Sequence, residues 1–175
     1  MKFSSRESIK AIEQAQYREK EAVDLYERCF ESAANEGVRT ILRMLAAEEQ
    51  KHYRIMVQLA ADAQTDNLPA VDTGTGESAR EVFDKAFAHI SMSDFTADGA
   101  GIDELLVQAL ENEKESFNLY SSLADSSESM ETAAVFQYLA AEENKHYIMV
   151  SNMLNFLGDP GRWLYEEENL IFRRG

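Results

Sequence analysis

The sequence predicts an all-α fold, a four-helix bundle made of two helical hairpins joined by a long crossover. Four segments carry apolar residues at helical spacing, and the two prolines both fall outside these segments. The chain also repeats itself: residues 15–60 align without a gap on residues 109–154, with 15 identities in 46 positions. Because each copy contains two of the periodic segments, each copy predicts one hairpin.

The four helices are predicted at residues 5–34, 38–62, 102–125 and 130–157. Ser4 and Glu7 match a capping box at the start of the first helix. The tripeptide Asn35-Glu36-Gly37 is predicted to end that helix. Short connections within each pair predict antiparallel neighbours, as in other helical bundles.

The crossover between the hairpins covers residues 62–101, and a tail covers residues 158–175. Residues 65–78 have the composition of a loop. A short amphipathic helix is predicted at residues 79–90, where apolar residues recur at helical spacing. At this length, residues 1–175 are expected to form a single domain.

Composition narrows the classes of function. The net charge of −15 argues against a nucleic-acid partner, which would need basic clusters. No apolar run approaches a membrane span, and the N-terminus lacks the apolar stretch of a signal peptide. The single cysteine, Cys29, excludes an intramolecular disulfide and a four-cysteine iron site, and it fits a reducing, cytoplasmic setting.

The repeat is most faithful in its polar residues. The string LAAEEQKHY at 45–53 returns as LAAEENKHY at 139–147, and EKE at 19–21 returns at 113–115. Carboxylate and imidazole side chains are costly to bury unless something binds them. The alternative is an old duplication whose solvent-facing charges never changed, and one Glu-x-x-His motif alone would be a weak signal.

Helical phase separates these two interpretations. At about 100° per residue, six side chains fall on the apolar stripes of the four helices: Glu19, Glu49, His52, Glu113, Glu143 and His146. Glu48 and Glu142 lie toward the edge of their stripes, whereas the duplicated Glu21 and Glu115 point away. The same phase places Phe117 on the inward stripe of the third helix. The inward set therefore predicts chemistry in the core.

Four carboxylates and two imidazoles in a bundle core predict a pair of divalent cations. Their combined charge of +4 balances four carboxylates, which would otherwise be prohibitive to bury. Oxygen and imidazole ligands together suit iron or manganese, and zinc is compatible. Tyr26 and Tyr120 each follow an inward Glu by seven residues, about two helical turns. They are predicted to hydrogen-bond within the polar layer, the alternative being simple core aromatics. His89, in the crossover, is interpreted as a surface or packing residue.

The order Glu, Glu-x-x-His, Glu, Glu-x-x-His resembles the di-iron carboxylate site of the ferritin-like superfamily. Within it, the chain is most similar to the rubrerythrin group. The strings AIEQAQYREKEAVDLY and LVQALENEKESFNLY resemble that group's first and third helices, and the LAAEE strings resemble its second and fourth. The resemblance covers roughly residues 5–157.

The resemblance implies a role for each inward residue. Glu49 and Glu143 would bridge two iron ions, each ion would take one histidine, and Tyr26 and Tyr120 would hydrogen-bond ligand carboxylates. Two features depart from the typical pattern. The chain lacks the cysteines of a rubredoxin module, so electrons are expected from a separate donor such as a rubredoxin-like protein. Ser116 stands where the family carries an additional Glu, which favours a symmetric six-ligand site.

The expected function is a di-iron peroxidase or oxidase that reduces hydrogen peroxide or dioxygen during oxidative stress. Two alternatives stay open: a ferroxidase or iron-handling protein, and a non-catalytic bundle stabilised by metal. A homodimer in the cytoplasm is expected, with no membrane or nucleic-acid partner.

Overall fold

The computed structural model describes residues 6–62, 81, 85, 101–127 and 130–159. These residues form four long helices: α1 (Arg6–Ser32), α2 (Glu36–Asp62), α4 (Ile102–Ser126) and α5 (Met130–Gly158). No strand occurs within these ranges. The prediction of an all-α four-helix bundle is confirmed, and all four helices begin and end within a few residues of their predicted bounds.

Several sequence predictions fall outside the described residues. The capping box at Ser4 is one, and the tail beyond residue 159 is another. Of the predicted short helix at 79–90, residues 81 and 85 are described, and both are helical. In the part of the chain that is described, no helix combines the length and apolar character needed to cross a membrane.

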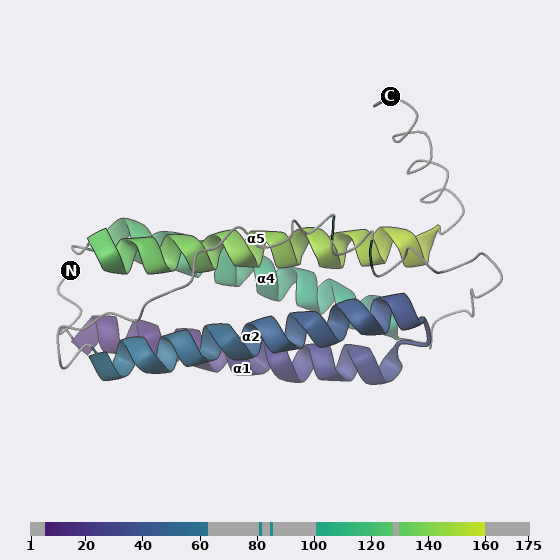
Figure 1. Cartoon of the computed structure of the whole chain (residues 1–175), viewed down its shortest axis with the longest axis horizontal. Coiled ribbons are helices and arrows are strands. Elements are labelled where there is room, and N and C mark those ends of the chain that lie inside the picture. Colours follow the sequence, from purple (N-terminus) through teal and green to yellow (C-terminus); the bar gives the residue numbers. More distant parts are fainter. Residues whose placement is uncertain (1–5, 63–80, 82–84, 86–100, 128–129, 160–175) are drawn as a thin grey trace, which may run out of the picture.

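The bundle consists of two antiparallel hairpins laid one on the other (Figure 1). α1 packs along α2, and α4 packs along α5. The hairpins meet mainly where α1 contacts α4, and α2 approaches α5 at fewer points. This arrangement brings one face of every helix to a shared central core.

The turn between α1 and α2 is built around Asn35. Its Oδ1 atom accepts hydrogen bonds from the backbone N–H groups of Gly37 (2.9 Å) and Val38 (3.2 Å). It thereby satisfies two of the amide groups that a helix leaves free at its start. The tripeptide predicted to end α1 therefore opens α2, which begins at residue 36 and not at 38.

The core consists of two apolar clusters separated by a polar layer. One cluster includes Leu25, Leu45, Leu106 and Met153, and the other includes Ile12, Met56, Phe136 and Leu139. Along every helix, the predicted inward Glu and His residues lie between the part in one cluster and the part in the other. The polar side chains thus share one level of the bundle, with apolar packing on both sides.

The inward face of α4 differs from the prediction at one position. Phe117 is 38% exposed, so its assignment to the core was wrong. The buried stripe of α4 runs through Ala109, Glu113, Ser116 and Tyr120 instead. Because α4 packs against α1 as well as α5, its buried face is turned toward the Ser116 side.

Candidate metal centre

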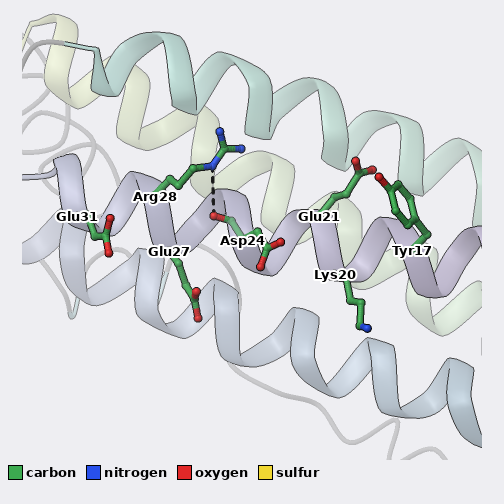
Figure 2. A pocket seen from close by; sticks show the side chains of 7 residues that line it. All are labelled: Tyr17, Lys20, Glu21, Asp24, Glu27, Arg28 and Glu31. Atoms are coloured by element: carbon green, nitrogen blue, oxygen red, sulfur yellow. Dashed lines mark hydrogen bonds between the residues drawn. The ribbon is translucent and has the colours of Figure 1, made fainter.

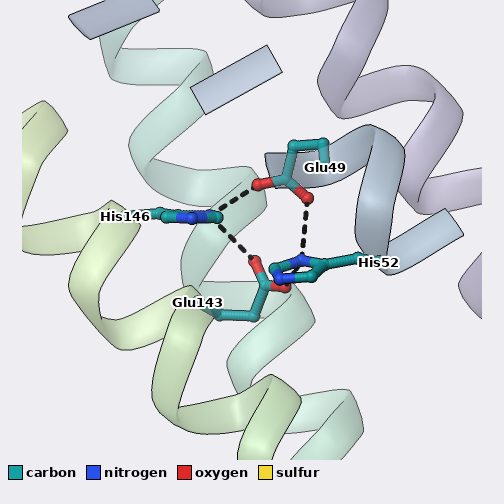
Figure 3. A group of neighbouring side chains, drawn as sticks. All are labelled: Glu49, His52, Glu143 and His146. Atoms are coloured by element: carbon teal, nitrogen blue, oxygen red, sulfur yellow. Dashed lines mark ion pairs between the residues drawn. The ribbon is translucent and has the colours of Figure 1, made fainter. Parts of the chain in front are cut away.

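Six ionisable side chains meet in the polar layer, and each is at most 1% exposed. α1 and α4 each contribute a glutamate, whereas α2 and α5 each contribute a Glu-x-x-His pair: Glu19, Glu113, Glu49 with His52, and Glu143 with His146. In a Glu-x-x-His pair the two side chains lie on one helical face, since residues three apart are neighbours on the surface of a helix. Figure 3 shows the α2 and α5 pairs pointing toward one another.

His52 faces three carboxylates through one ring nitrogen. Its Nδ1 atom lies 2.9 Å from Glu143 Oε1, 3.3 Å from Glu49 Oε2 and 3.7 Å from Glu19 Oε2. Two of these carboxylates come from the first hairpin and one from the second.

His146 repeats the arrangement from the other side. Its Nδ1 atom lies 2.6 Å from Glu49 Oε1, 3.6 Å from Glu113 Oε2 and 3.9 Å from Glu143 Oε2. Both imidazoles therefore approach Glu49 and Glu143. His52 also approaches Glu19 of its own hairpin, and His146 also approaches Glu113 of its own hairpin. The two rings are nearly parallel, with centroids 5.4 Å apart and an interplanar angle of 19°. The cluster has two halves and a shared centre.

Many polar atoms of the cluster lack a hydrogen-bond partner among the described residues. They include one oxygen of each carboxylate and the Nδ1 atom of each histidine. The short Nδ1–oxygen approaches are therefore not well-directed hydrogen bonds. Buried polar atoms are normally satisfied, and a cation shared by the facing lone pairs would satisfy these. With four carboxylates and two imidazoles, the donor set fits two divalent cations.

The pKa values of the cluster show how strongly these groups interact. Burial raises the pKa of Glu19 and of Glu143 well above the ordinary value, and the Glu49 carboxylate adds to both shifts. Burial also opposes the charge of Glu49, yet the imidazoles of His146 and His52 hold its pKa well below its usual range. Burial disfavours the His52 imidazolium, yet Glu49 raises its pKa to about 9. Without a cation the cluster therefore holds protons, which a bound metal would displace.

The two tyrosines flank the polar layer from opposite sides. Tyr26 belongs to one apolar cluster and donates a hydrogen bond from its hydroxyl to Glu113 Oε1 of the other hairpin. Tyr120 belongs to the other cluster, and its buried hydroxyl has no partner among the described residues. The predicted hydrogen bond within the polar layer is present for Tyr26, whereas Tyr120 makes none among the described residues. Sequence spacing carried no signal that Tyr26 would reach across to the second hairpin.

The remaining duplicated charges lie outside the core. Lys51 Nζ lies 2.5 Å from Glu48 Oε1, and the equivalent pair of Lys145 and Glu142 repeats this distance. Ion pairs on the outer faces of helices contribute little to stability. The repeated string therefore combines an inward Glu-x-x-His pair with an outward ion pair on the same helix.

A separate pocket of about 620 Å³ lies on the outward face of α1 (Figure 2). Acidic side chains dominate its lining, including Glu21, Asp24, Glu27 and Glu31. None of the six clustered side chains lines it. Glu21 thus faces solvent, as its helical phase predicts, and this pocket is distinct from the candidate metal centre.

The fold and the cluster define a class: an antiparallel four-helix bundle with a buried carboxylate and imidazole centre suited to two metal ions. The rubrerythrin family model matches residues 2–60 and 104–170. The chain belongs to the rubrerythrin family. Comparisons with curated proteins and with solved structures gave no match.

Proposed function

We propose that this protein is a di-iron oxidoreductase that reduces hydrogen peroxide or dioxygen. The observation that supports it best is the two-halved cluster, in which both imidazoles approach the same two carboxylates. In this proposal Glu49 and Glu143 would be shared by the two ions. Glu19 and His52 would help to hold one ion, and Glu113 and His146 would help to hold the other.

When bound, a pair of ferrous ions would supply the two electrons that, together with two protons from solvent, convert hydrogen peroxide to two waters. The protein residues hold the geometry for this reaction. The four carboxylates offset the cationic charge, and the apolar clusters on both sides limit access of water. Tyr26 orients Glu113 through its hydrogen bond.

Tyr26 is suited to this positioning role because its hydroxyl stays protonated. Burial, and next the Glu113 carboxylate, raise the pKa of Tyr26 well above its ordinary value. A protonated phenol donates to a carboxylate without adding negative charge to the layer. Ser116, buried beside the cluster, cannot replace a carboxylate ligand, so the proposed ligand set is the symmetric six.

Iron is the proposed metal because it is typical of the family and because oxygen and imidazole donors suit it. Re-reduction of the oxidised centre would require a separate electron donor, and a rubredoxin-like protein is the proposed partner. The homodimeric state stays a prediction.

Stopped-flow absorbance tests the proposal. Anaerobic protein loaded with two ferrous ions per chain is mixed with hydrogen peroxide or with oxygenated buffer, beside a Glu49→Gln variant. We expect oxidation of the loaded protein to be much faster than that of free ferrous ion or of the variant. Equal rates in all three samples, with both oxidants, would reject an oxidoreductase.

The fate of the oxidised iron separates this function from iron handling. A peroxidase or oxidase retains both ions through repeated cycles of reduction and oxidation, whereas a ferroxidase releases them. Desalting after one oxidation, followed by elemental analysis, measures retention. Recovery of less than one ion per chain would favour the iron-handling alternative.

A further inference from the structure

A second cavity lies between α1 and α2 and has a volume of about 450 Å³. Its apolar lining comes from both helices of the first hairpin: Val23, Phe30, Leu42, Ala46 and Ala47. Tyr26 also lines it. Cavities of this size fall in the range of small-molecule sites, about 300–1,000 Å³.

The cavity ends one side chain away from the candidate metal centre. Tyr26 lines the cavity, and its hydroxyl donates to Glu113 in the polar layer. Tyr26 and Leu42 are at most 1% exposed, so they form the floor, whereas Ala47 is exposed and lies at the mouth. A molecule in the cavity would therefore contact the phenol that orients a proposed metal ligand.

The internal repeat differs at one residue of the cavity floor. The equivalent of Leu42 in the second hairpin, 94 residues later, is Phe136. Its ring is fully buried and stacks on Tyr120, with centroids 6.1 Å apart and an interplanar angle of 18°. The smaller Leu42 leaves the face of α2 beside Tyr26 without such a ring.

Two arginines of α2 hold the Phe30 wall of the cavity. The Arg39 guanidinium lies 3.8 Å from the centroid of the Phe30 ring, and that of Arg43 lies 4.9 Å away. Arg39 also donates to the carbonyl oxygens of Phe30 (2.9 Å) and Ala33 (3.1 Å) at the end of α1. The aromatic wall is therefore preformed.

Size and charge indicate the class of ligand. A water molecule occupies only about 30 Å³ of liquid. Hydrogen peroxide has one more oxygen atom than water, so it would fill only a small part of the cavity. The apolar lining suits an alkyl or aryl group. The polar lining has two carboxylates, Glu27 and Glu31, against the single guanidinium of Arg43, so it disfavours an anion. A molecule with an apolar group and no negative charge therefore fits the lining, and a neutral hydroperoxide meets both conditions.

We propose that the α1–α2 cavity binds the apolar group of a neutral organic hydroperoxide and presents its O–O bond at Tyr26, beside the metal centre. This inference rests on the proposed function. In the iron-loaded protein, ROOH would take one electron from each of the two ferrous ions and two protons from the buffer. Its O–O bond would break, and the products would be the alcohol ROH, water and two ferric ions.

Binding is tested without turnover by using 2-phenyl-2-propanol, the alcohol that reduction of cumene hydroperoxide yields. Methyl NMR spectra of the full-length protein are recorded during its titration, first metal-free and then with redox-inert zinc. We expect saturable shifts at the Leu42, Ala46 and Ala47 methyl groups and none at Ala141, the equivalent of Ala47 in the second hairpin. Shifts confined to other regions, or absent, would overturn the proposal.

Two matched variants extend the test to the reaction. Ala47→Phe fills the mouth of the cavity, and Ala141→Phe adds the same ring at the exposed, equivalent position of α5. We expect Ala47→Phe to lower the affinity for 2-phenyl-2-propanol by about tenfold. The rate at which cumene hydroperoxide oxidises the ferrous protein, divided by the rate with hydrogen peroxide, should also fall by about tenfold. Ala141→Phe should change neither quantity.

The outcomes separate this inference from the proposed function. If hydrogen peroxide oxidises the ferrous protein but cumene hydroperoxide does not, the inference fails alone. Equal effects of the two variants would also overturn it. If neither peroxide nor dioxygen oxidises the ferrous protein, the proposed function fails, and the binding titration then decides whether the cavity holds the apolar group.

Discussion

In the first hairpin, Tyr26 reaches across the core to Glu113 of the second hairpin and forms the floor of a cavity. In the second hairpin, Tyr120 lies against the ring of Phe136, and its hydroxyl has no partner among the described residues. The contacts of the glutamates and histidines are alike in the two halves, because each imidazole approaches the same two shared carboxylates. The halves thus match in the polar layer and diverge around it.

This contrast indicates that the residues kept the same in both halves are those that would bind a common ligand. A shared cation would need donors from both copies, so a change in one half would damage the whole centre. Residues beside the layer share no such ligand. Leu42 and Phe136 could therefore diverge without removing a metal donor, and only Tyr120 has an aromatic ring stacked on it from this position of the repeat.

The largest expected effect tests whether the shared carboxylates, which both imidazoles approach, matter more for metal binding than Glu19 and Glu113, which one imidazole approaches. Glu49→Gln removes the charge of a carboxylate that both imidazoles approach, so we expect loss of both metal ions. Glu19→Gln should weaken one ion more than the other. Substitution of a residue that only hydrogen-bonds a metal ligand typically lowers the metal affinity by about 10–100-fold, and both variants should lower it by more. Elemental analysis after dialysis against iron or zinc measures the bound metal.

Glu21→Gln and Glu115→Gln are the matched controls for these ligand variants. Both residues are duplicated, like the inward glutamates, yet both are exposed. Each variant should keep the metal content of the wild type. Metal loss in these variants equal to that of Glu49→Gln would contradict the assignment of the centre to the core.

A second expected effect is stabilisation of the fold by metal. At a free concentration 100 times its Kd, a cation that binds only the folded state adds about 2.7 kcal/mol to the free energy of unfolding. For a chain of this length the midpoint of thermal unfolding should rise by about 5–10 °C. Differential scanning calorimetry with and without metal measures this shift. Glu143→Gln should abolish it, and an unchanged midpoint in the wild type would argue against a buried site.

The tyrosines give a smaller but sharper test. Tyr26→Phe removes a buried donor to Glu113, so we expect the metal-free protein to lose about 1–3 kcal/mol of unfolding free energy. Tyr120→Phe removes a hydroxyl that has no partner, and the free energy should stay within about 0.5 kcal/mol or increase. Urea denaturation measures both. Equal losses in the two variants would erase the difference between the halves.

The smallest expected signal comes from Cys29. This thiol is fully buried in the cluster that contains Tyr26, and burial raises its pKa to about 11. The reactive thiolate is therefore scarce at pH 8. We expect almost no reaction with Ellman's reagent until urea unfolds the protein. Rapid reaction in the folded protein would show that the first hairpin opens readily.

The fold and the positions of the six inward residues were accessible to sequence reasoning because helical periodicity and a gapless internal repeat act together. The repeat alone would have left Glu21 and Glu19 hard to distinguish, since both are duplicated. The phase of the stripe separated them, and the exposure of Glu21 and the burial of Glu19 agree with it. The ligand roles of the inward residues stay predictions.

Other features depended on contacts between helices that periodicity does not encode. Phe117 falls within the range of the apolar stripe, yet packing of α4 against two neighbours turns the buried face toward Ser116. Asn35 follows α1 in the sequence, but its side chain caps α2. The reach of Tyr26 to Glu113 depends on how the two hairpins are placed, which no spacing within one helix reveals.

The polar layer between two apolar clusters also restricts how the hairpins can slide. If one hairpin moved along the other by a single helical turn, about 5.4 Å, apolar side chains would still face apolar side chains over much of the interface. The same movement would separate His52 from Glu143 and His146 from Glu49, and would leave these charged groups facing apolar side chains. The cluster therefore selects one longitudinal alignment of two surfaces that are otherwise permissive.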